Sequence, residues 1–216
     1  MIELLHTDCM EYMKALPDNA FDLAIVDPPY GIGCDKKKSW GTRNKTKVKT
    51  TYKPKNWDIV PNKSYFDNLF RVSKNTIIFG ANYFVNYLPP SKCWIVYDKR
   101  QNVNVSFAMA ELAYTSFDKS CKMYSASRAY IQNNKNHARI HPTQKPVELY
   151  KWILNIFAKP GNRILDTHLG SGSIAIACHD LGFDLVGCEI DADYHAAAKA
   201  RLDDIRSHTP APLPLR

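Results

Sequence analysis

A strand, a glycine-rich turn and a helix in succession constrain the fold of this chain more than any other feature. Arg163–Asp166 is predicted to be a short buried strand, and Ser173–Leu181 a mostly apolar helix. Gly170 and Gly172 lie in the turn between them, and a second apolar strand follows at Phe183–Cys188. Because buried strands that alternate with helices form parallel sheets covered on both faces, the sequence predicts an α/β fold.

The rest of the chain supplies further elements of the same kinds. Apolar runs predict strands at residues 21–26, 76–79, 93–97 and 109–117. One helix is expected after the N-cap residue Asp8, and a second is expected to begin at a capping box formed by Ser64 and Asp67. Two more are expected at 147–157 and near the C-terminus, the last with Tyr194, Ala198 and Leu202 on one face. Residues 31–62 and 118–141 are expected to be loops, and the Pro-rich residues 207–216 a tail.

Length and composition narrow the class of protein. A chain of 216 residues is long enough for one well-buried domain and short for two, and 45% hydrophobic residues exclude a wholly disordered protein. No run of 18 apolar residues is present, and the N-terminal sequence lacks the pattern of a secretory signal. The six cysteines form no C-x-x-C pair. We therefore expect a cytoplasmic protein with reduced thiols and without a structural metal.

The glycine-rich turn has the features of a nucleoside-binding site. Gly170 and Gly172 allow a close backbone approach to a ligand, and Glu189, at the end of the next strand, can accept hydrogen bonds from ribose hydroxyls. Two glycines alone are a weak signal, and a tight turn without a ligand is the alternative. The third glycine of the dinucleotide motif is missing. Asp166 instead suits a ligand with a positive charge, such as the amino group of S-adenosylmethionine.

Asp27-Pro28-Pro29-Tyr30 is the sharpest motif in the sequence. The two prolines end the preceding strand, and they fix the Asp27 carboxylate and the Pro28 carbonyl as a pair of acceptors. Such a pair suits the two N–H donors of an exocyclic amine, and Tyr30 offers a face for stacking a planar base. The alternative is a Pro-Pro turn with a capping Asp and a core Tyr. We favour the catalytic interpretation because the glycine-rich turn occurs in the same chain.

With both motifs in place, the chain resembles the permuted beta group of DNA amino-methyltransferases, which act on adenine N6 or cytosine N4. Further likenesses are His6-Thr7-Asp8-Cys9, Trp94–Lys99 and His141-Pro142-Thr143-Gln144-Lys145-Pro146. The resemblance implies a Rossmann-like, S-adenosylmethionine-dependent fold with a mostly parallel seven-stranded sheet and one antiparallel hairpin. It implies a single domain at 1–206, with a catalytic half at about 1–117 and a cofactor half at about 141–206.

The resemblance also implies roles for individual residues. Asp27, Pro28, Pro29 and Tyr30 are expected to be catalytic. The cofactor is expected to contact Asp8, Cys9, Lys145, Asp166, His168, Gly170, Ser171, Gly172 and Glu189. One departure stands out, because Thr167 and His168 occupy positions where the family usually has Pro and Phe. We expect a packing role for His168.

A run of basic residues follows the catalytic motif. The net charge is +8, and nine of the 29 Lys and Arg residues lie between positions 35 and 55. A solvated loop is the alternative, but a position beside the active-site mouth favours contact with DNA phosphates. The candidate DNA-binding residues are Lys36, Lys37, Lys38, Trp40, Arg43, Lys45, Lys47 and Lys49, and a weaker second patch comprises Arg128, Lys135 and Arg139.

These observations predict an S-adenosylmethionine-dependent methyltransferase that acts on adenine N6 of double-stranded DNA after flipping the base out of the helix. Within the family, Asp-Pro-Pro-Tyr favours adenine over cytosine. Cytosine N4 methylation is the first alternative, and a DNA-binding regulator with a decayed cofactor pocket is a second. RNA, protein glutamine and nicotinamide-dependent chemistry are more distant. A homodimer could supply missing DNA contacts, and a restriction endonuclease could be a partner in a bacterium or a phage.

Overall fold

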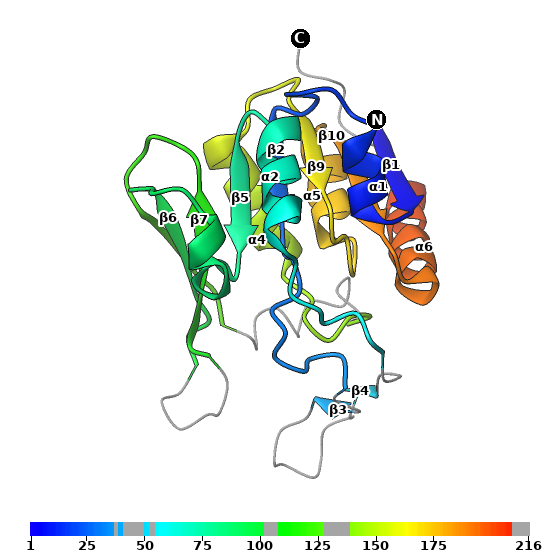
Figure 1. The fold of residues 1–216 in the computed structure, drawn as a ribbon. Helices are drawn as coiled ribbons and strands as arrows, with labels where there is room; N and C mark the ends of the chain where they lie inside the picture. The colour runs from blue at the N-terminus through cyan, green and yellow to red at the C-terminus, as the bar shows by residue number, and fades with distance from the viewer. Residues whose placement is uncertain (37–38, 41–49, 52–54, 102–107, 128–138, 209–216) are drawn as a thin grey trace.

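The computed structural model describes residues 1–36, 39–40, 50–51, 55–101, 108–127 and 139–208. Its centre is an eight-stranded sheet in the order β1-β10-β9-β2-β5-β7-β6-β8 (Figure 1). The strands are β1 (Ile2–His6), β2 (Leu23–Val26), β5 (Thr76–Phe79), β6 (Trp94–Asp98), β7 (Ala110–Thr115), β8 (Lys122–Ser125), β9 (Arg163–Asp166) and β10 (Asp184–Glu189). Within this sheet β7 runs antiparallel to β5 and β6, and the other pairs are parallel.

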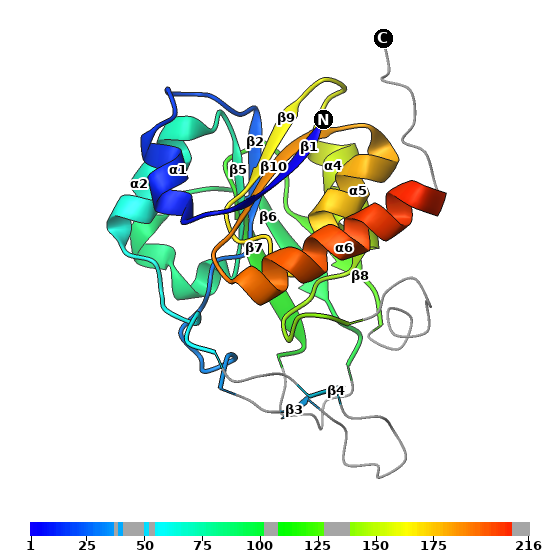
Figure 2. The same ribbon diagram turned by 90° about the vertical axis from the view of Figure 1, so that its right-hand side faces the viewer.

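Helices cover both faces of the sheet, which confirms the predicted fold class. Figure 2 shows α1 (Cys9–Lys14) and α2 (Lys63–Val72) on one face, and α4 (Val147–Phe157), α5 (Ser173–Leu181) and α6 (Ala192–His208) on the other. Two 3-10 turns, η1 (Ala81–Tyr83) and η2 (Val85–Tyr87), follow β5. A short antiparallel pair, β3 (Ser39–Trp40) with β4 (Thr50–Thr51), lies beyond the carboxyl edge of the sheet (Figure 1).

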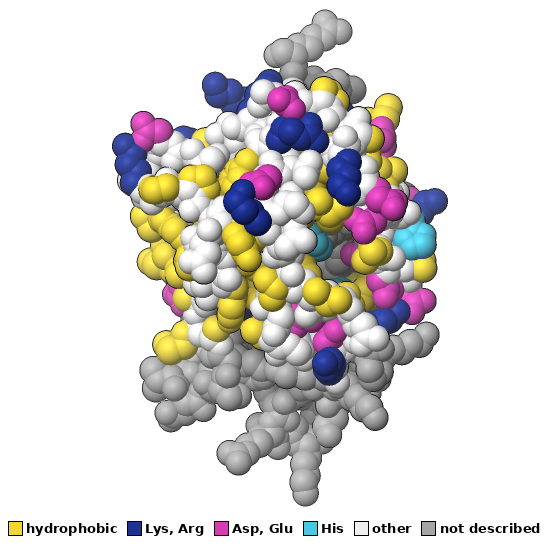
Figure 3. Space-filling model, viewed as in Figure 1, with side chains coloured by type: hydrophobic (Ala, Val, Ile, Leu, Met, Phe, Trp, Pro, Cys, Tyr) yellow, Lys and Arg dark blue, Asp and Glu magenta, His cyan; other side chains and the backbone are white. Residues whose placement is uncertain are grey.

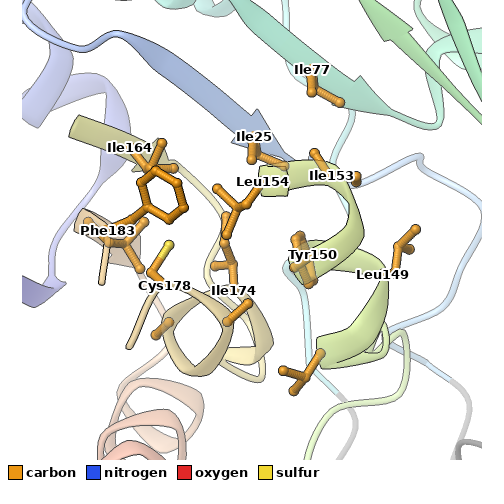
Figure 4. Close-up of a cluster of buried hydrophobic side chains, with 14 of the residues drawn as sticks. Ile25, Ile77, Leu149, Tyr150, Ile153, Leu154, Ile164, Ile174, Cys178 and Phe183 are labelled. Atoms are coloured by element: carbon orange, nitrogen blue, oxygen red, sulfur yellow. The ribbon is translucent and has the colours of Figure 1, made fainter. Parts of the chain in front are cut away.

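The core is divided between the two faces by the sheet. On the α4 and α5 side, apolar side chains of both helices pack on the central strands, and Figure 4 shows Leu154 and Ile174 among them. A second cluster, which includes Phe66 and Phe84, fills the α1 and α2 side. Both faces of β2 and β5 are therefore buried, which explains why these strands are uninterrupted apolar runs in the sequence.

Glycines set both ends of α5. Gly172, the N-cap, has φ +69°, and Gly182, the C-cap, has φ +74°, a region in which side chains with a Cβ are strained. The N–H of Gly182 bonds to the carbonyls of Cys178 and His179, which closes the last turn. The turn before α5 and the loop after it are therefore fixed by backbone geometry.

Several predicted boundaries were wrong. The N-cap of α2 is Asn62, which accepts from the Ser64 N–H, and Asp67 pairs with Lys63 one turn away instead of closing a capping box with Ser64. The predicted loop at 118–141 contains the edge strand β8. The predicted tail at 207–216 begins too early, because α6 continues to His208, and residues 209–216 lie outside the described part.

The first strand was not predicted, and it changes the division of the chain into halves. Residues Ile2–His6 pair in parallel with β10, on the cofactor side of the sheet. The N-terminal segment therefore does not lie within a catalytic half at 1–117. The sheet has eight strands where seven were expected, and the additional strand is β8, which pairs with β6.

One surface of the β6–β7–β8 region carries exposed apolar side chains. Leu112 and Met123 are 36% and 66% exposed, and Val85 in η2 is 58% exposed. Hydrophobic side chains are visible at the left of Figure 3, over β6 and β7. None of the helices within the described ranges is long and apolar enough to cross a bilayer.

Candidate active site

Acidic residues stand at the carboxyl ends of four neighbouring parallel strands. In sheet order they are Asp8 after β1, Glu189 at the end of β10, Asp166 at the end of β9 and Asp27 after β2. The Thr7 N–H bonds to the Glu189 carbonyl at 3.1 Å, so the first two strand ends are held together. The carboxyl edge of a doubly wound sheet is where such folds bind ligands. The fold thus gathers the acids that the sequence singled out.

The carboxylate of Asp27 is bonded on both oxygens. The Tyr30 hydroxyl donates to Oδ1, and the Lys145 ammonium donates to Oδ2. Lys145 lies in the segment before α4, and its side chain is only 5% exposed, against 15% for Asp27. The sequence had assigned Lys145 to the cofactor. In the structure its ammonium group lies against the catalytic motif, at Asp27.

A second carboxylate completes this charge cluster. Glu111 on β7 lies 3.2 Å from Lys145 Nζ, and its other oxygen lies 2.5 Å from Lys99 Nζ. Burial alone would raise the pKa of Glu111, but the two ammonium groups outweigh it and lower the pKa to about 2. Burial likewise opposes the charge on Lys145, yet Asp27 and Glu111 leave its pKa raised. Glu111 and Lys145 are therefore both charged near neutral pH.

The ring of Tyr30 is held by the turn after β5. Gly80 has φ +65°, and a Cβ on it would lie 2.1 Å from Tyr30 Cε1, so only glycine leaves room for the ring. Tyr83 stacks on Tyr30, with ring centroids 4.9 Å apart and an angle of 13° between the planes. Tyr83 is 47% exposed. Burial and the neighbouring Asp27 raise the pKa of Tyr30 well above its usual value, so its hydroxyl keeps its proton.

The glycine-rich turn is tied to the strand beside it. Glu189 Oε2 accepts from the Gly170 N–H at 2.8 Å, and Oε1 accepts from the Asp191 N–H at 2.9 Å. Arg201 on α6 donates to the Ser171 carbonyl and to the Ser173 hydroxyl. Each Glu189 oxygen retains a second lone pair, so the carboxylate can hold its turn and still accept from ribose hydroxyls.

Asp166 is buried beneath this turn. It is 2% exposed and accepts from the His168 N–H at 2.9 Å. Within the described residues no ammonium or guanidinium group pairs with it. Burial, with repulsion from Asp27 and Glu189, raises the pKa of Asp166 to about 8. The site therefore favours a ligand that brings a positive charge to this carboxylate.

Thr167 and His168, the two departures from the family pattern, take part in a hydrogen-bonded cluster. The Thr167 hydroxyl lies 2.7 Å from the Tyr65 hydroxyl and 2.9 Å from His168 Nδ1. The His168 ring meets the Tyr65 ring edge to face. Burial lowers the pKa of His168 to about 4, so the ring is neutral. His168 thus packs against Tyr65 in this structure.

Asp8 and Cys9 begin α1 at the outer end of the acidic row. Asp8 Oδ1 accepts from the Met10 N–H at 2.7 Å and so caps the helix, as the sequence predicted. Burial and the charge of Asp8 raise the pKa of Cys9 to about 12, so this thiol stays protonated. The Asp8 carboxylate keeps its other oxygen for a ligand.

Two segments far apart in the sequence meet over the glycine-rich turn. Trp57 stacks at a tilt on His141, with centroids 5.1 Å apart, and His141 meets Tyr194 at 4.3 Å. A Cβ on Gly170 would lie 3.7 Å from the His141 ring, which places this aromatic cluster against the turn. The sequence did not identify either Trp57 or Tyr194 as a site residue: it placed Tyr194 only on the apolar face of the last helix, and Trp57 lies in no recognisable motif.

The segment with the run of basic residues, here called the basic loop (31–62), is held in place near both of its ends. Lys55 pairs with Asp191 and Asp193 at 2.7 and 2.8 Å, so this lysine of the basic run is engaged with acids of the protein. Asp58 accepts from the N–H groups of Gly31 and Cys34. These contacts anchor both ends of the segment beside the acidic row.

Most of the candidate DNA-binding residues lie outside the part of the chain that the structure describes. Lys36 is described and exposed, and Trp40 is described only as part of β3. Lys37, Lys38, Arg43, Lys45, Lys47 and Lys49 lie outside the described residues, as do Arg128 and Lys135. Arg139 donates to the His141 and Pro142 carbonyls, within the segment that covers the glycine-rich turn.

Comparison with known families and proteins gives a consistent result. A family model described as DNA methylase, for N6 and N4 methyltransferases, matches residues 34–200. The match includes the glycine-rich turn and begins just after Asp27–Tyr30. Among curated proteins, the type II methyltransferase M.HpaI of Haemophilus parainfluenzae is 24% identical over 93% of this chain and 74% of its own length.

Solved structures show the same fold at low identity. The M1.HpyAVI–SAM complex matches with a TM-score of 0.61 and 19% identity, covering 94% of this chain and all of the other. The PvuII DNA methyltransferase, described as cytosine-N4-specific, matches with a TM-score of 0.60 and 12% identity over 93% of this chain and 86% of its own.

Proposed function

This chain belongs to the DNA methylase family of amino-methyltransferases, and we propose on that premise that it methylates the N6 atom of adenine in DNA. It is a DNA methyltransferase that uses S-adenosylmethionine. The observation that carries the proposed methylation of an exocyclic amine is the position of Asp27, which stands beside the cofactor strand β9 and is followed by the rigid pair Pro28-Pro29.

The residues of the cofactor side fit S-adenosylmethionine. Asp166 is a buried carboxylate that needs a cation, and the cofactor's amino group would supply one. Gly170 and Gly172 allow the methionine end to approach the backbone, with Ser171 between them. Glu189 would accept from the ribose hydroxyls, and Asp8 and Cys9 would lie toward the adenine, at the outer end of the row. His168 would pack beside the cofactor.

The residues of the catalytic side would bind and activate the target amine. Asp27 Oδ1 and the Pro28 carbonyl would accept its two N–H bonds, and the Tyr30 hydroxyl would then give up its hydrogen bond to Oδ1. An amine held this way keeps its lone pair for forming the new N–C bond. When bound, S-adenosylmethionine supplies a methyl group made electrophilic by its sulfonium. The methylated nitrogen then loses one proton, which Asp27 is in place to accept.

The choice of base rests on the first residue of the catalytic motif. Asp at the first position of the motif favours adenine by resemblance to the family. Cytosine N4 is the specific alternative, because the PvuII enzyme, which has the same fold, is described as cytosine-N4-specific. Both bases present an exocyclic amine with two N–H donors, so the acceptor pair would serve either one.

The basic loop would contact the DNA. Lys36 is exposed just after the catalytic motif, and we propose that the following lysines, Arg43 and Trp40 continue this contact with the backbone and the flipped base. Together, residues 1–206 would form a single catalytic unit. Neutralising Lys36, Lys37 and Lys38 should weaken DNA binding and reduce its salt dependence. Unchanged affinity and salt slope would contradict this role.

Product identity tests the proposed function. The protein is incubated with S-adenosylmethionine and unmethylated DNA of mixed sequence, and the DNA is digested to nucleosides for mass spectrometry. N6-methyladenine is the expected product. N4-methylcytosine would preserve the chemistry but refute the choice of base. No methylated nucleoside from a protein that binds the cofactor would contradict DNA methylation in this form, and neither product nor cofactor binding would favour a regulator.

A further inference from the structure

Lys145 is a buried cation between two carboxylates, and the catalytic mechanism described above does not use it. Its ammonium group donates to Asp27 Oδ2 and lies 3.2 Å from Glu111 Oε2, and its side chain is 5% exposed. Lys145 Nζ also lies 4.5 Å from the centroid of the Phe79 ring, which belongs to the hydrophobic core. A lysine this deeply buried costs free energy unless its partners compensate, so its position is specific.

We propose that Lys145 is a positioning residue for methyl transfer, which fixes the orientation of the Asp27 carboxylate so that Oδ1 is presented to the target amine. This inference rests on the proposed function of Asp27. With Oδ2 bound by Lys145, rotation of the carboxylate would break a charge-assisted hydrogen bond. The carboxylate therefore offers one oxygen, and in the structure that oxygen is the one to which Tyr30 donates.

Glu111 has the matching role of holding Lys145. Its two oxygens are shared between Lys145 and Lys99, and it lies on β7, opposite Tyr97 of β6. The order Lys99, Glu111, Lys145, Asp27 alternates in charge from the edge of the site to the reacting group. Because Lys145 stays protonated between two acids, it cannot take the proton that the amine loses. Its contribution is therefore geometric and electrostatic.

The test separates this role from a cofactor contact. Lys145→Met removes the ammonium and keeps the length of the side chain, and Lys145→Arg keeps a cation. The rate of a single turnover is measured at saturating cofactor and DNA, and cofactor affinity is measured by calorimetry. A displacement of about 1 Å at a reacting group costs roughly 100-fold, so we expect a loss of about that size for Lys145→Met. Cofactor affinity should stay within about threefold, and Lys145→Arg should recover part of the rate.

A parallel loss of cofactor affinity, with an unchanged rate at saturation, would overturn the proposal and return Lys145 to the cofactor site. Lys151→Met is the matched control, because Lys151 is also a paired lysine, bonded to Asp180 at 2.5 Å, but lies outside the site. If Lys145→Met fails to fold, the double variant Lys145→Met/Glu111→Gln removes one charge of each sign and should show the same loss of rate. A double variant with the wild-type rate would refute the proposal.

A second measurement does not depend on activity, so it distinguishes failure of this inference from failure of the proposed function. In protein labelled with 15N-lysine, the Lys145 ammonium should give a signal protected from exchange with water, and Asp27→Asn should remove that protection. A Lys145 signal unaffected by Asp27→Asn would refute the pairing, even in an inactive protein. A disturbed signal with no methylated product would retain the pairing and refute only the function.

Discussion

The carboxyl ends of β9 and β2 lie side by side, but the carboxylates at these two ends have different bonding partners. Asp166 at the end of β9 is buried with one backbone N–H as its partner, and its pKa is raised to about 8. Asp27 after β2 is bonded by the hydroxyl of Tyr30 and the ammonium of Lys145. The first carboxylate needs a cation from its ligand, and the second receives one from the protein.

This difference fits the two tasks. A carboxylate that is left without a cation is a selective site for a positively charged cofactor, because the ligand relieves its burial. A carboxylate that must act on a neutral amine needs a fixed direction, and a protein cation can provide that direction. Substitutions at the two turns should therefore separate cofactor binding from methyl transfer.

The largest effect is expected from Asp27→Asn. The amide keeps the shape of the side chain but replaces one acceptor oxygen with a donor and removes the charge. Single-turnover methyl transfer should fall by at least about 10³-fold, while cofactor affinity measured by calorimetry stays nearly unchanged. A parallel loss of cofactor affinity would mean that Asp27 supports the fold of the site instead of acting on the amine.

Asp166→Asn should give the opposite pattern. The variant loses the charge that a cofactor ammonium would meet, so cofactor affinity should weaken roughly 10- to 100-fold. The rate at saturating cofactor should change much less. If affinity is retained, the ammonium of the cofactor is not bound at this strand end.

Gly80→Ala sharpens the comparison on the catalytic side. The new Cβ would lie 2.1 Å from the Tyr30 ring, at a φ of +65°. We expect a loss of about 1–3 kcal/mol in the free energy of unfolding and slower methyl transfer, because Tyr30 must move. Gly33→Ala is the control, since it has φ +73° but nothing within 4 Å. It should show the backbone strain in thermal unfolding without the loss of rate. Equal rates in the two variants would contradict the role of Gly80 in holding Tyr30.

His168→Phe should have the smallest effect. The change installs the residue that the family usually has, and a Phe ring can keep the edge-to-face contact with Tyr65. Cofactor affinity should change by less than about threefold in a fluorescence titration. A tenfold loss or more would assign His168 a direct hydrogen bond to the cofactor.

The cofactor turn could be predicted from the sequence far better than the charge cluster around Asp27. Asp166, Gly170 and Gly172 lie in one continuous strand–turn–helix segment, so spacing alone defines their geometry. Asp27 is bonded by Lys145, and Lys145 in turn lies against Glu111, so the cluster joins three distant segments through tertiary packing. Local patterns carry no information on such pairs.

The missed strands have a similar cause. Ile2–His6 and Lys122–Ser125 are the two edge strands of the sheet, and their side chains are mostly half-buried or exposed. They lack the uninterrupted apolar runs that identified β2, β5 and β9. The pairing partner, and not the local composition, makes them strands.

The linkage between cofactor binding and protons tests most directly the claim that Asp166 takes its cation from the ligand. Its pKa of about 8 means that Asp166 is mostly protonated at pH 7. Because this pKa is raised above that of the unfolded chain, the ligand-free fold loses stability as the pH rises from about 4 to about 8. Calorimetric titration with S-adenosylmethionine in buffers of different ionisation enthalpy should show release of a proton at pH 7, with affinity rising up to about pH 8. Asp166→Asn should abolish both effects. A wild-type affinity independent of pH, with no proton released, would contradict the account.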